Sequence, residues 1–142
     1  MGSHQSRDNF DYNKLGNGTV NIKLTESDIA LIKTSWNSVK DHEELGLAIM
    51  IRIFKVHSNI KHVWIFSTRL ETEEEIRNDS QVRYHSKKLV NTFDKIIKDL
   101  ETDFIKHKEF LVNLGTKHYH YDLKYEYFKV INCIFIYMLK NL

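Results

Sequence analysis

The chain has 142 residues, of which 42% are hydrophobic and 28% are charged, so it is long enough for one globular domain with a sizeable core. Lys and Arg number 21 and Asp and Glu 19, and a net charge of +2 is too small and too mixed to favour a nucleic-acid partner. The single cysteine, Cys133, excludes an internal disulfide, and the sequence has neither a secretory signal nor an 18-residue apolar run. We therefore expect a cytoplasmic protein.

Helix-breaking residues are scarce, with 0 Pro and only 5 Gly, which favours an all-α fold. Residues 1–23 are polar and show no sustained hydrophobic period, so they are predicted to form a flexible N-terminal arm before a domain of residues 24–142. The first residues, "MGSHQS", also fit the N-myristoylation pattern with Gly2 as acceptor. One acyl chain anchors a protein only marginally, so peripheral membrane association is expected only if Gly2 is acylated.

Two helices are predicted at the start of the domain. Thr25 and Asp28 have the spacing of a capping box, and apolar residues follow at helical intervals through Trp36. From about Glu43 to His57 the sequence is apolar over a wide arc, which indicates a helix covered on several sides. This second helix should be central to the fold.

Residues 59–79, "NIKHVWIFSTRLETEEEIRND", interrupt the helical pattern and are predicted to be a solvated connector. Asp79 or Ser80 is expected to cap the next helix. One face of this helix is apolar except for a histidine. The residues on this face lie at offsets 0, +3, +7, +11 and +14, and are Val82, His85, Leu89, Phe93 and Ile96.

Two more helices are predicted toward the end of the chain. In "KEFLVNLGTKH", residues 108–118, Leu111, Leu114 and His118 share one face, so a second histidine lies on an apolar stripe. Residues 127–142, "YFKVINCIFIYMLKNL", are apolar nearly all round and predict a helix that needs neighbours.

The two histidines raise the question of function. One histidine on an apolar face is usually a core residue bonded to backbone, but two on separate helices favour a shared ligand, because burying an imidazole without a partner costs a few kcal/mol. Iron in a flat cofactor would satisfy both. Zinc is a weaker alternative, since His118 and His120 would point about 200° apart on a helix. Cys133 has no activating neighbour, and the acidic run is solvated, so hydrolase chemistry has no support.

From Leu24 onward the motifs together resemble the globin family, most closely the neuroglobin and globin X-like branch. "LTESDIALIKTSW" resembles the first globin helix, and "RIFKVHSNIKHVW" resembles the segment leading to the corner that contacts haem. His85, 21 residues after Trp64, occupies the place of the distal histidine, and "LGTKH" ends on the match to the proximal one, His118. Trp64 stands where the family has a near-invariant Phe, and Ser58 stands where it usually has Pro.

The resemblance implies a globin fold with haem b, iron protoporphyrin IX, between helices, His118 as proximal iron ligand and His85 as distal residue and possible sixth ligand. It implies a haem pocket lined by the following side chains: Leu89, Phe93, Leu111, Leu114, Trp64 and Phe66. No catalytic residue is singled out.

The resemblance also implies reversible binding of O2, NO or CO for storage, supply or sensing. The alternatives are a haem redox enzyme acting on nitrite or nitric oxide, and a globin-like interaction module without haem. Leu142 falls at the close of what would be the penultimate globin helix, so we expect the final helix to be absent. Its absence should expose some of Ile134, Phe135, Ile136 and Met138 and favour a homo-oligomer.

Overall fold

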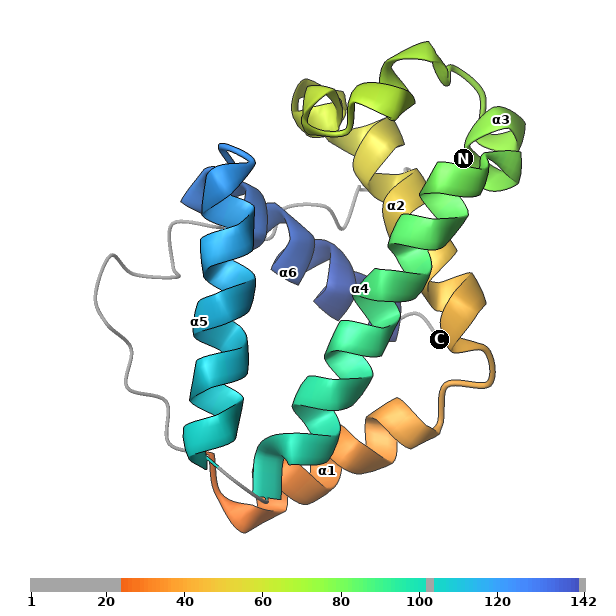
Figure 1. The fold of residues 1–142 in the computed structure, drawn as a ribbon. Coiled ribbons are helices and arrows are strands. Elements are labelled where there is room, and N and C mark those ends of the chain that lie inside the picture. The colour runs from red at the N-terminus through yellow and green to blue at the C-terminus, as the bar shows by residue number, and fades with distance from the viewer. Residues whose placement is uncertain (1–23, 102–103, 141–142) are drawn as a thin grey trace, which may run out of the picture.

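A computed structural model of the chain describes residues 24–101 and 104–140, without the side chains at 104–107, 133, 135 and 137–140. All regular structure in these residues is helical, which confirms the all-α prediction (Figure 1). The elements in chain order are α1 (Glu26–Asn37), α2 (His42–Val56), η2 (Ser58–Val63), η3 (Ile65–Arg69), α3 (Glu73–Asn78), α4 (Ser80–Lys98), η4 (Asp99–Glu101), α5 (Phe104–His120) and α6 (Tyr125–Lys140). The predicted N-terminal arm and Gly2 lie outside the described residues.

Side-chain caps fix where two of the helices begin. Thr25 and Asp28 form a complete capping box at α1, in which Asp28 Oδ2 accepts from the Thr25 backbone N–H at 2.8 Å. Asp79 caps α4, where its Oδ1 accepts from the backbone N–H groups of Gln81 at 2.9 Å and Val82 at 3.0 Å. Both predicted starts are confirmed, and the helix that carries His85 therefore begins at a fixed position.

Helix α2 is central, as its apolar arc predicted. It packs against both α4 and α6, and Ile49 and Ile53 have no exposed surface. Gly46 lies where α2 meets α4: a Cβ atom added there would lie 2.7 Å from the Ser86 carbonyl oxygen and 2.8 Å from Val90 Cγ1. The two backbones approach this closely only because Gly46 has no side chain. As a result α4 rests directly on α2 one residue away from His85.

The segment 59–79 differs from the solvated connector that was predicted. It forms η2, η3 and α3, and Ile60 and Ile76 are each only 1% exposed. Each of these helices spans five or six residues. Such short pieces do not repeat an apolar position often enough to produce a recognisable period. The acidic residues Glu73, Glu74 and Glu75 do lie on the surface, in the first turn of α3.

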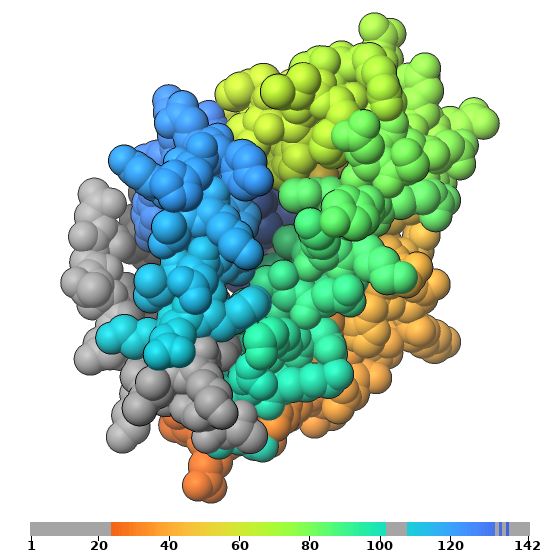
Figure 2. All heavy atoms as spheres, viewed as in Figure 1, coloured from red at the N-terminus to blue at the C-terminus, as the bar shows by residue number. Residues whose placement is uncertain are grey.

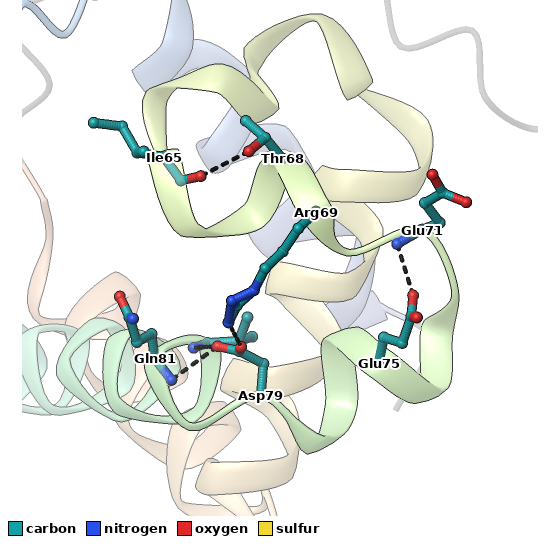
Figure 3. Close-up of polar contacts among 8 residues, drawn as sticks. Ile65, Thr68, Arg69, Glu71, Glu75, Asp79 and Gln81 are labelled. Carbon is teal, nitrogen blue, oxygen red and sulfur yellow. Dashed lines mark hydrogen bonds and ion pairs between the residues drawn. The ribbon is translucent and has the colours of Figure 1, made fainter.

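Polar contacts hold this segment against the start of α4 (Figure 3). Thr68 Oγ1 donates to the Ile65 carbonyl at 2.9 Å, and Glu75 Oε2 accepts from the Glu71 backbone N–H at 2.9 Å. Arg69, at the end of η3, forms an ion pair with Asp79, the residue that caps α4. The corner that contains Trp64 is therefore tied to the helix that contains His85.

Helices α4 and α5 stand opposite each other, and α6 crosses behind them (Figure 1). On α6, Ile134 is only 3% exposed because α6 packs on α2, so Ile134 is not among the exposed members of the predicted set. Ile136 is 42% exposed, and the side chains of Phe135 and Met138 lie outside the described set. Within residues 24–101 and 104–140, no helix is long and apolar enough to cross a membrane.

Candidate functional site

The surroundings of His85 include an indole from the corner between η2 and η3. Trp64 Nε1 donates a hydrogen bond to His85 Nε2 at 3.0 Å, and the two rings meet edge-on with centroids 5.6 Å apart. Trp64 also lies edge-on to the buried ring of Phe54 on α2, again at 5.6 Å between centroids. The indole thus bridges the core and the half-buried imidazole.

His85 is neutral at physiological pH. Burial chiefly, with smaller Coulombic effects of His118 and Lys88 in the same direction, lowers its pKa from an ordinary value of 6.5 to about 4. The helices that carry His85 and His118, α4 and α5, stand opposite each other (Figure 1). A neutral imidazole is the form that binds a metal ion or exchanges hydrogen bonds as both donor and acceptor.

His118 is oriented by its own helix. Its Nδ1 lies 2.7 Å from the Leu114 carbonyl oxygen. Since a carbonyl only accepts, Nδ1 is the donor of this hydrogen bond, and in the neutral tautomer that donates from Nδ1 the lone pair is at Nε2. Metal-ligating histidines are commonly held by such a bond from the other ring nitrogen. The ring of Phe128 on α6 lies edge-on to the imidazole at 5.3 Å between centroids.

The apolar residues predicted to line the pocket differ in burial. Leu89, Phe93, Trp64 and Phe66 are half-buried and pack against the core. On α5, Leu114 is half-buried and Leu111 is 40% exposed. Figure 2 shows a recess between α4 and α5, with α6 at its floor. The predicted pocket residues come from α4, α5 and the η2–η3 corner.

His120 does not join His118 in a shared site, because its side chain is exposed while that of His118 is half-buried. Among the described residues, no group of three or more His, Cys, Asp or Glu side chains could hold a metal ion. Two imidazoles on facing helices are instead the donor set that suits iron held in a flat macrocycle, which supplies the remaining ligands itself.

One functional contact was not predicted from the sequence. Trp64 was expected to pack against haem in place of the usual Phe, and its hydrogen bond to His85 was missed. The available signal was the residue type itself: tryptophan places an N–H donor where phenylalanine has none.

The fold and the paired histidines describe an all-α protein of the class that holds haem between helices. The sequence model of the family described as Globin matches residues 47–142, and the chain belongs to the globin family. It is 28% identical over 118 residues to cytoglobin-2 of Danio rerio, covering 82% of this chain and 65% of that protein. The chain thus spans less than two thirds of the length of that relative.

Two neuroglobins are similar to a comparable extent. Neuroglobin-2 of Oncorhynchus mykiss is 27% identical over 119 residues, 83% of this chain and 74% of that protein. Neuroglobin of Danio rerio is 27% identical over 120 residues, 84% of this chain and 75% of that protein. These matches extend N-terminal to the range of the family model and include α1 or much of it, since they cover more than four fifths of the chain.

Proposed function

We propose that the chain binds haem b in the recess between α4 and α5 and there binds O2 or another diatomic gas, such as NO or CO, reversibly. The observation that carries this proposal is the hydrogen bond from His118 Nδ1 to the Leu114 carbonyl, at 2.7 Å, on a helix that faces His85. This bond engages Nδ1 and leaves Nε2 as the ring nitrogen that would bind iron. Membership of the globin family supports the same cofactor.

His118 acts as the proximal ligand in this proposal. Its bond to Leu114 fixes the tautomer and the ring direction, so little ordering is needed when Nε2 binds the iron. Haem, when bound, would supply the iron that binds a small gas. Leu111 and Leu114 from α5 and Leu89 and Phe93 from α4 form the apolar walls that exclude water and slow oxidation of the iron.

In this proposal His85 acts from α4, which stands opposite the helix that carries His118. As a neutral imidazole it either donates a hydrogen bond to the gas or binds the iron itself as a sixth ligand. The low pKa of about 4 keeps it uncharged across the physiological range, so neither role is lost to protonation there. Storage, supply and sensing of a gas are all compatible with these groups.

Titration of the haem-free protein with haem tests the proposal. We expect a Soret band that saturates at one haem per chain in the wild-type protein. His118→Ala should lose this tight binding. His120→Ala is the matched control, because it removes a nearby imidazole that is exposed on the same helix. Equal haem binding by His118→Ala and wild type would contradict the assignment of the proximal ligand.

A further inference from the structure

We infer that Trp64 is a positioning residue that controls His85: its indole N–H occupies His85 Nε2, so His85 binds iron or donates to a gas through Nε2 only after this hydrogen bond opens. The inference rests on the proposed haem function. It goes beyond that function because Trp64, at the corner between η2 and η3, would compete with the iron for His85 Nε2.

The first argument is the direction of the hydrogen bond. An indole N–H only donates, so at 3.0 Å the His85 Nε2 atom must be the acceptor. A neutral imidazole that accepts at Nε2 carries its proton on Nδ1. In that tautomer Nε2 has no hydrogen to donate, and its lone pair is already engaged. Both proposed roles of His85 at Nε2 therefore require Trp64 to release it.

The second argument is that Trp64 is anchored on both sides of the bond. Its backbone N–H donates to the Lys61 carbonyl at 3.0 Å, and its own carbonyl accepts from the Ser67 N–H at 2.8 Å. Its ring packs on the buried ring of Phe54. These contacts hold the indole where its N–H reaches His85 Nε2.

The other tryptophan, Trp36, provides a control for the role of Trp64. Trp36 Nε1 donates to the Asp94 carboxylate oxygen Oδ1 at 3.1 Å, a hydrogen bond between α1 and α4 that does not involve His85. Trp36→Phe therefore removes an indole donor of the same chemistry as Trp64→Phe and serves as its control. Phenylalanine is also the residue that the globin corner usually carries, so Trp64→Phe should fold.

The first arm of the test uses haem-free protein and nitrogen-15 NMR of the histidine rings. We expect His85 in the Nδ1–H tautomer in the wild type and in Trp36→Phe, and a shift toward the Nε2–H tautomer in Trp64→Phe. An Nε2–H tautomer in the wild-type protein would overturn the inference. Circular dichroism of each variant confirms equal helix content.

The second arm uses haem-loaded protein and competition between CO and His85. In Trp64→Phe the equilibrium constant for iron ligation by His85 should rise roughly two- to tenfold over wild type, the factor that corresponds to the net contribution of one hydrogen bond. Trp36→Phe should leave it unchanged. An unchanged constant in Trp64→Phe, or an equal rise in both variants, would overturn the role of Trp64 while leaving haem binding intact. The lack of a Soret band in wild-type protein would instead refute the proposed function, and with it any competition for iron.

Discussion

Replacing Gly46 with alanine tests the close contact on which α4 rests. The new Cβ would lie 2.7 Å from the Ser86 carbonyl oxygen, 2.8 Å from Val90 Cγ1 and 3.2 Å from the Ser86 carbonyl carbon. A backbone oxygen cannot rotate away as a flexible side chain can, so α4 must shift. Overpacking of this kind typically costs about 1–3 kcal/mol.

Alanine also has a higher helix propensity than glycine, by about 1 kcal/mol, which partly hides the cost of overpacking. Gly115→Ala on α5 corrects for this gain, because a Cβ there would meet nothing within 4 Å. The difference between the two variants therefore isolates the overpacking, and Gly46→Ala should be less stable than Gly115→Ala by about 1–3 kcal/mol. Urea unfolding of haem-free protein, followed by circular dichroism, measures both free energies. Equal stability of the two variants would refute the account of the α2–α4 contact.

Three further changes have defined outcomes. Asp79→Ala removes the cap of α4 and should lower the free energy of unfolding in urea by about 1–2 kcal/mol; no loss would contradict the cap. The pKa of His85 is about 4 in the folded protein and 6.5 in the unfolded chain. The contribution of neutral His85 to the free energy of unfolding is therefore complete above pH 6.5 and is lost as the pH falls toward 4, by at most about 3 kcal/mol. Between pH 7 and pH 5, haem-free His85→Gln should therefore lose less free energy of unfolding in urea than the wild-type protein. Leu111→Ala, at a side chain 40% exposed without haem, should change haem-free stability by less than about 1 kcal/mol yet weaken haem binding in a titration.

The long helices were predictable because their signals are local. The capping box of Thr25 and Asp28 and the cap at Asp79 depend on residues at most three positions apart. The central place of α2 followed from its wide apolar arc. Residues 59–79 were misjudged because Ile60 and Ile76 lie in short helices and are buried by packing against the neighbouring helices α2 and α4, which the pattern within the segment does not reveal.

The sequence also indicated which histidines belong to the candidate site. Helical periodicity identified His85 and His118 as inward-facing residues, and the resemblance to globins gave them expected roles. The backbone carbonyl that orients His118 belongs to its own helix, as such bonds usually do. The bond from Trp64 to His85 could not be predicted, since it joins residues 21 positions apart and depends on how η2 and η3 turn the corner.

Reversible CO binding by the reduced, haem-reconstituted wild-type protein tests the central claim most directly. We predict a Soret band at one haem per chain that shifts when CO is added and returns when CO is removed. His118→Ala should lose the band under the same conditions. Absence of the band in the wild-type protein, or a band that CO does not shift, would contradict the proposal that His118 and His85 flank a gas-binding haem.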